Sequence, residues 1–146
     1  MSNTSDAAGG ELSGRVLRLI ECMHGLVQRG KRDGDVEVDD WLALADIVEI
    51  EGFERIGPFH DALDWQGYTE MLTGWVNNTE GWDPVVKQVS EAGDTVFVQC
   101  EEMLTQGDEV VPFYSLSMYR FNPAGKICHI GVYMQQTHVY DPDAAA

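Results

Sequence analysis

The stretch that decides the fold is MYRFNPAGKICHIGVYM, residues 118–134. Apolar and aromatic residues flank the segment NPAG on both sides, and this pattern predicts two antiparallel strands joined by a tight turn. Two similar turns, AGD at 92–94 and QGDE at 106–109, precede it between runs rich in β-branched and aromatic residues. Three hairpins in succession predict a four-stranded antiparallel meander over residues 85–136.

The first half of the chain has helical periodicity instead. One apolar stripe with a period near 3.6 begins at Leu12 and ends before RGKRDGD, and a second covers residues 68–76 and is closed by GWDP at 81–84. Between them, Asp39 and Asp40 are candidate N-caps for a short helix through WLALA at 41–45. The sequence therefore predicts three N-terminal helices.

Two short strands are expected between the second and third helices, one over DIVEIEGF at 46–53 and one toward ALDW at 62–65, with a turn at Gly57-Pro58. Helices first and an antiparallel sheet second predict an α+β domain with the helices on one face of a curved sheet. With 146 residues, we expect one domain over 11–138 and flexible tails at 1–10 and 139–146.

Charge and composition exclude several classes of partner. The chain has 25 acidic and 9 basic residues and a net charge of −16, which opposes binding to nucleic acid or to an anionic membrane. No basic region followed by an apolar run begins the sequence, so we expect a cytoplasmic protein. The three cysteines are widely spaced and the four histidines have no ligand spacing, so neither disulfides nor a metal site is expected.

Segment 118–134, together with ALADIVEIEG at 43–52 and WQGYTEMLTGW at 65–75, resembles the nuclear transport factor 2-like superfamily, in its ketosteroid isomerase and SnoaL-like groups. The resemblance covers residues 11–136. It implies a cone-shaped barrel in which the sheet curls around the helices and leaves an apolar pocket. It also implies a homodimer and catalysis without a cofactor. Because the superfamily includes isomerases, lyases, epoxide hydrolases and non-catalytic binding proteins, it does not choose among functions.

The resemblance places Glu51 where ketosteroid isomerases have their general-base carboxylate. A carboxylate in an apolar pocket is a competent base near neutral pH. Val48 and Ile50 share one face of this strand, so Glu51 is on the other face, which either lines the pocket or leaves Glu51 in solvent. The family's oxyanion hole is altered here: Ser117 stands at the position of its protonated aspartate, and its helix-one tyrosine has no counterpart except His24. His24 is then either a hydrogen-bond donor and proton carrier or a surface histidine of the helix.

Periodicity adds further candidates. Glu102 falls on the apolar face of its strand, so it is either buried and functional or lies where the strand leaves the core. On the next strand Ser115, Ser117 and Tyr119 share a face, and its two serine hydroxyls among aromatic residues suit either binding of an aromatic or polycyclic ligand or a packed core. Trp75 on the third helix is a further candidate contact. Arg55 and His60 bracket the Gly57-Pro58 turn, either at the pocket mouth, where Arg55 would fix a carboxylate or phenolate, or in solvent.

These residues lead to three hypotheses. The first is a cofactor-independent lyase or isomerase that transfers a proton on a bulky aromatic or polycyclic substrate by dehydration, double-bond migration or carbon–carbon cleavage such as deformylation. Glu51 would be the base, with His24 or His60 relaying the proton. The second is a non-catalytic module that binds a hydrophobic ligand. The third is an epoxide hydrolase, for which Arg55 and Asp61 are the available residues.

Overall fold

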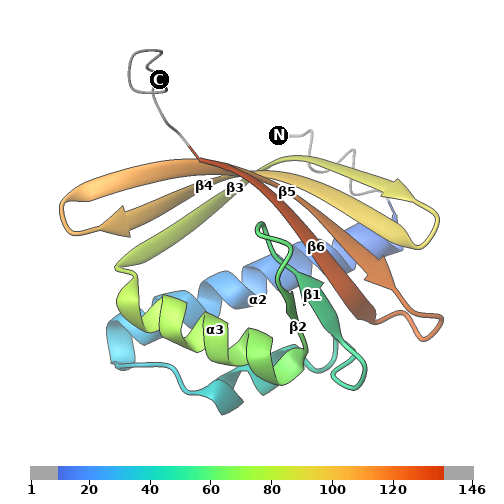
Figure 1. Ribbon diagram of the computed structural model, residues 1–146, viewed down its shortest axis with the longest axis horizontal. Helices are drawn as coiled ribbons and strands as arrows, with labels where there is room; N and C mark the ends of the chain where they lie inside the picture. The colour runs from blue at the N-terminus through green and yellow to red at the C-terminus, as the bar shows by residue number, and fades with distance from the viewer. Residues whose placement is uncertain (1–9, 137–146) are drawn as a thin grey trace.

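The computed structural model describes residues 10–136, and its element order confirms the α+β prediction (Figure 1). Of the expected tails, all but Gly10 lie outside the described residues, as do the last two residues of the predicted domain. The helical elements are α2 (Glu11–Asp33), the 3-10 helix η1 (Val38–Leu44) and α3 (Trp65–Asn78). The strands are β1 (Glu54–Ile56), β2 (Ala62–Leu63), β3 (Gly81–Ala92), β4 (Thr95–Gln106), β5 (Glu109–Phe121) and β6 (Ile127–Gln136).

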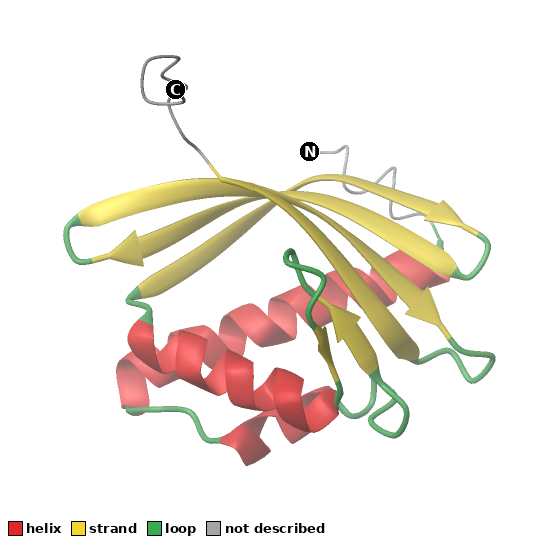
Figure 2. Ribbon diagram, viewed as in Figure 1, coloured by secondary structure: helices red, strands yellow, loops and turns green. Residues whose placement is uncertain are grey.

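The six strands form one curved sheet in the order β2-β1-β6-β5-β4-β3. Its four long strands are the predicted meander, and each pairs antiparallel with the next. The β1–β6 pair is parallel, which the sequence did not predict. All three helices lie on one face of the sheet, which arches over them without closing into a barrel (Figure 2). The arch therefore leaves a space between the helices and the strands.

Helix α2 buries the predicted apolar stripe against the sheet, with Val16, Leu19 and Val27 almost fully inaccessible. Its first turn is held from β3, because the backbone N–H and hydroxyl of Ser13 both donate to Glu91 Oε1, at 3.0 and 2.6 Å. The helix stops at Gly34, whose φ of 109° only glycine adopts readily.

The connections around α3 fix its position relative to η1 and the sheet. Trp41 of η1 is buried, and its indole N–H donates to Thr73 Oγ1 of α3 at 2.9 Å. Asp64 caps the N-terminus of α3 by accepting from the Gly67 N–H. The sequence prediction that GWDP closes this helix is wrong, since the segment begins β3. Pro84 fits there because β3 is an edge strand, where a missing N–H costs no ladder bond.

Segment 46–53 is the main departure from the predicted secondary structure. Only Val48 pairs there, through an isolated parallel bridge to Ile127. The chain then turns, with the Phe53 N–H donating to the carbonyl of Ile50 and Gly52 at a φ of 77°. A glycine with positive φ at the third position is the signature of a type II turn. Glu51, at the second position of that turn, is exposed.

A β-bulge alters which residues of β6 face inward. The β5–β6 register shifts between Arg120 and Phe121, so that Phe121 pairs with Ile127 and Arg120 with His129. Cys128 is the extra residue and is half-buried, while Ile127 and Ile130 are both buried. Strict alternation along residues 126–136 would place Cys128 on the same face as Ile130, and the bulge is the reason that it does not lie there.

Candidate functional site

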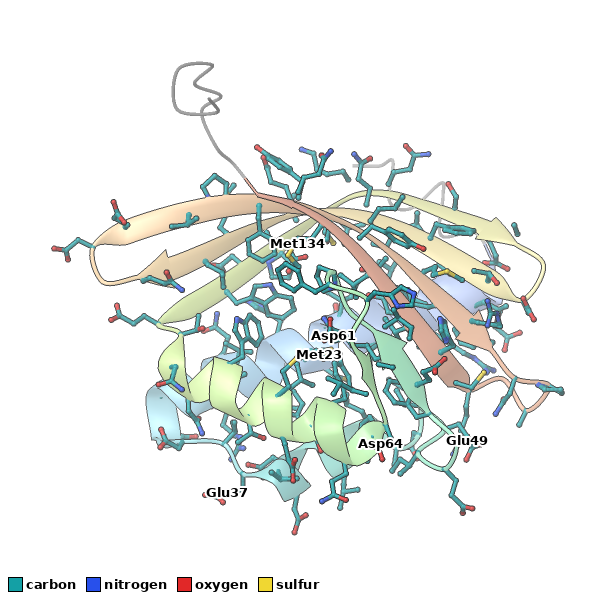
Figure 3. All side chains as sticks on the ribbon, in the orientation of Figure 1. Met23, Glu37, Glu49, Asp61, Asp64 and Met134 are labelled. Carbon is teal, nitrogen blue, oxygen red and sulfur yellow. The ribbon has the colours of Figure 1, made fainter. Side chains whose placement is uncertain are left out.

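The space between the helices and the sheet holds a cavity of about 300 Å³. Its walls come from α2, α3, β1 and the four long strands, and most of the lining side chains are apolar or aromatic. In Figure 3, Met23 of α2 and Met134 of β6, both lining residues, lie on opposite sides of this space. Of the described residues that line it, Glu102 is the only carboxylate and Arg55 the only cation.

The sheet wall of the cavity is a grid, because alternate residues of each strand face inward and pair across the strands. At one end of the grid Arg55 pairs with Ile130, which pairs with Tyr119. At the other end Glu102 pairs with Phe113 on one side and Pro84 on the other. The two charged residues thus occupy opposite ends of the wall.

Glu102 is held by two donors from neighbouring strands. Its Oε1 accepts from the indole N–H of Trp82 at 2.7 Å, and its Oε2 accepts from the hydroxyl of Ser115 at 2.5 Å. Trp82 and Ser115 are both buried, at 7% and 6% exposure. Because each carboxylate oxygen has a donor on a packed strand residue, the carboxylate has a fixed orientation within the apolar wall.

Three further ionisable groups near Glu102 are held in their neutral forms. Burial, and then the charge of Glu102, raises the pKa of the Cys100 thiol to about 12. Burial raises the pKa of the Tyr68 phenol to about 12, with Glu102 adding to the effect and Arg55 opposing it. Burial raises the pKa of Tyr119 further still, with Tyr68, Cys100 and Glu102 contributing. At neutral pH both phenols are therefore hydrogen-bond donors.

Arg55 reaches the cavity from β1. Its side chain is 11% exposed, and its Cζ lies 5.5 Å from the ring centroid of Tyr68, within cation–π range. The nearest carboxylate is that of Asp61, whose Oδ2 is 3.9 Å from Arg55 Nη1.

All five residues predicted to bind substrate line the cavity: Arg55, Trp75, Glu102, Ser117 and Tyr119. The Glu102 side chain lines the cavity and is partly buried, so this strand has not left the core at Glu102. Ser117 is buried, and Trp75 packs edge-on against Trp82 with ring centroids 5.4 Å apart.

The three residues predicted to be catalytic are not among the lining residues. Glu51 is exposed in the turn after Ile50. His60 is exposed at a φ of 63° and closes the turn by donating its N–H to the carbonyl of Gly57. His24 lies behind Trp82, with ring centroids 6.0 Å apart, and its Nε2 is 3.2 Å from Asp83 Oδ1. The structure thus does not bring Glu51 together with either histidine.

The sequence pattern predicts that Ser115 faces the pocket but not that it donates to Glu102. Trp82 and Tyr68 are site residues that the sequence did not predict. Ser115 alternates with Ser117 and Tyr119, and Tyr68 shares the helical face of Trp75, so both carried a periodicity signal. Trp82 has no such signal, because the pattern of residues 68–84 predicts that GWDP ends a helix. Its role as a donor depends on the pairing of β3 with β4, which sets Trp82 opposite Leu104, two residues from Glu102.

The outer face of the sheet carries a second group of apolar side chains. Tyr114, Leu116 and Tyr133 are 42%, 47% and 65% exposed, and Leu116 pairs directly with Tyr133 across β5 and β6. Within residues 10–136, no cluster of His, Cys, Asp or Glu is arranged to hold a metal ion. None of the helices in the described part of the chain has the length and apolar run needed to cross a bilayer.

No protein-family model matches the sequence, and no curated protein matches it. Solved structures match the fold. IdmH, a candidate polyketide cyclase from Streptomyces antibioticus, aligns over 86% of this chain and 93% of its own, at 14% identity and a TM-score of 0.68. A SnoaL-like candidate polyketide cyclase from Jannaschia sp. CCS1 aligns over 85% of each chain, at 18% identity and a TM-score of 0.66.

An NTF-2 like protein of unknown function from Burkholderia xenovorans LB400 aligns over 93% of this chain and 94% of its own, at 14% identity and a TM-score of 0.59. At these identities the likeness establishes the fold alone. The chain has the fold of the nuclear transport factor 2-like superfamily, as the resemblance in residues 118–134 predicted.

Proposed function

We propose that the protein is a cofactor-independent lyase or isomerase that transfers a proton on an aromatic substrate, with Glu102 as the proton-transferring group. The observation that carries this proposal is the fixed carboxylate in an otherwise apolar cavity, with one donor on each oxygen. A general base needs a defined position relative to the carbon whose proton it removes, and the hydrogen bonds from Trp82 and Ser115 supply that position.

Removal of a proton next to a carbonyl leaves negative charge on oxygen, which donors in the cavity must stabilise. Tyr119 and Tyr68 both line the cavity as neutral phenols. They are the candidate donors to the developing oxyanion, in place of the tyrosine and aspartate of ketosteroid isomerases. Glu102 takes the base role that the sequence resemblance assigned to Glu51.

The size and lining of the cavity support an aromatic substrate of about two rings. An apolar protein cavity of about 150 Å³ accommodates benzene, and this cavity has about 300 Å³. Aromatic side chains come from three elements, Tyr68 and Trp75 from α3, Trp82 from β3 and Phe113 from β5. Such walls bind planar rings by stacking and edge contacts. Dehydration and double-bond migration begin with removal of such a carbon-bound proton, whereas carbon–carbon cleavage with loss of formaldehyde begins with removal of a hydroxyl proton by the same base.

A two-ring ketone tests the proposal directly. The measurement is the enzyme-dependent uptake of deuterium at the α-carbon of 2-tetralone in D2O, followed by NMR. We expect the wild-type protein to accelerate the exchange and Glu102→Gln to slow it by about a hundredfold or more, the usual contribution of a general base. Glu51→Gln is the matched control, because this glutamate is exposed and outside the cavity lining. It should leave the rate within about threefold of wild type.

The opposite pattern, with Glu102→Gln unaffected and Glu51→Gln slow, would restore the assignment made from the sequence. Binding of 2-tetralone without any acceleration of exchange would favour the non-catalytic ligand-binding module. An epoxide hydrolase of the Asp-Arg-Asp kind needs two acids beside Arg55, whereas Asp61 is the one carboxylate that the described residues bring within 4 Å of it.

A further inference from the structure

Arg55 has more hydrogen-bonding capacity than its surroundings use. Its Nε is buried and has no hydrogen-bond partner among the described residues. The hydrogen bond found for its terminal nitrogens is from Nη1 to the thioether of Met71 at 3.6 Å, and a thioether is a weak acceptor. A guanidinium has five donors, and leaving such donors unsatisfied in a poorly hydrated wall is unfavourable.

Asp61 does not meet this demand. Its separation of 3.9 Å from Arg55 Nη1 is beyond hydrogen-bond distance, and its side chain is 46% exposed. Gly57 lies beside the pair: a Cβ built there would come within 2.6 Å of Asp61 Oδ1 and 2.7 Å of Arg55 Nη1. The turn thus brings a carboxylate near the guanidinium from outside, while the inward side of Arg55 lines the cavity.

We propose that Arg55 binds an anionic oxygen group of the ligand, so that the substrate is an aromatic carboxylate or phenolate. Such a group supplies acceptors to the unsatisfied guanidinium and partners its charge in a site of low polarity. Tyr68 supports the same site, because its ring lies against the guanidinium and keeps it oriented.

The grid of the sheet wall fixes the orientation of this ligand. Arg55 and Glu102 occupy opposite ends, separated by β6 and β5 and by the rows of Ser117 and Ser115. A ligand anion is attracted to Arg55 and repelled by Glu102, so the anionic group and the carbon that exchanges its proton are at opposite ends of the molecule. The assignment of that carbon rests on the proposed function, whereas anion binding at Arg55 does not.

Binding of 2-naphthoate and of its neutral analogue naphthalene-2-carboxamide, measured by calorimetry at neutral pH, tests the inference. The two probes have the same rings, so their affinity ratio isolates the charge. Hydrogen bonds to charged groups predict that the wild-type protein prefers the carboxylate by about tenfold or more. Arg55→Gln should abolish the preference while the carboxamide still binds. Glu102→Gln should still prefer 2-naphthoate to the carboxamide even if it abolishes proton exchange. Failure of the base assignment and failure of the anion site are therefore distinguishable.

Asp61→Asn provides a second test that does not depend on the folding of an Arg55 variant. Removal of the partly exposed competing carboxylate should tighten naphthoate binding by about two- to threefold and leave carboxamide binding unchanged. Equal affinity of the two probes for the wild-type protein would overturn the inference, as would failure of naphthoate to bind or a preference that survives Arg55→Gln.

Discussion

Substitution of Ser115 by alanine tests whether Glu102 is held as the structure describes. The change removes one buried hydroxyl, which donates to Glu102 Oε2 at 2.5 Å, and leaves the rest of the wall in place. A hydrogen bond to a charged group contributes about 1.5–3 kcal/mol, and the partial burial of Glu102 favours the lower end. We expect Ser115→Ala to lower the free energy of unfolding by about 1.5–2 kcal/mol and Tm by about 3–8 °C.

The assay is equilibrium unfolding in urea followed by tryptophan fluorescence, with equal m-values as the check that only stability has changed. The matched control is Ser90→Ala, an exposed serine of β3, which should change stability by less than about 0.5 kcal/mol. The decisive step is a double-mutant cycle with Glu102→Leu. In the Glu102→Leu protein, Ser115→Ala should change the free energy of unfolding by about zero, because apolar replacement of both hydrogen-bond partners is nearly neutral. Equal costs in both backgrounds would refute the reasoning.

Two other predictions concern pH and assembly. Burial raises the folded-state pKa of Cys100 and Tyr68 to about 12 and also raises the pKa of Tyr119. As the pH rises, the unfolded chain therefore loses these three protons before the folded protein does. The free energy of unfolding should therefore be constant below about pH 9 and fall above it, by about 1.4 kcal/mol per pH unit for each group that titrates. Urea titrations between about pH 8 and 11 measure this, and a flat profile would contradict the prediction. The exposed patch around Leu116 and Tyr133 predicts a homodimer through the outer sheet face, and Leu116→Glu should convert it to a monomer in sedimentation; a monomeric wild-type protein at micromolar concentration would remove the inference.

Local patterns determined the elements of the fold wherever one periodicity ran unbroken. The four strands of the meander and helices α2 and α3 follow directly from periods of 2 and 3.6. The same alternation placed Glu102, Ser117 and Tyr119 on the inward face, since side-chain direction in a strand is a local property. It misplaced Cys128, because a bulge shifts the alternation by one residue and cannot be detected from period alone.

The sequence by itself determined the meander, the apolar wall and the binding candidates, while only the tertiary structure decided which carboxylate reaches the cavity. Glu51 follows Val48 and Ile50 in a strand-like pattern, but the type II turn at Gly52 carries it into solvent. Glu102 gained its orientation from Trp82 and Ser115, which are 20 and 13 residues away in sequence. Hydrogen bonds across strands depend on register, and register is set by the packing of the whole sheet against the helices.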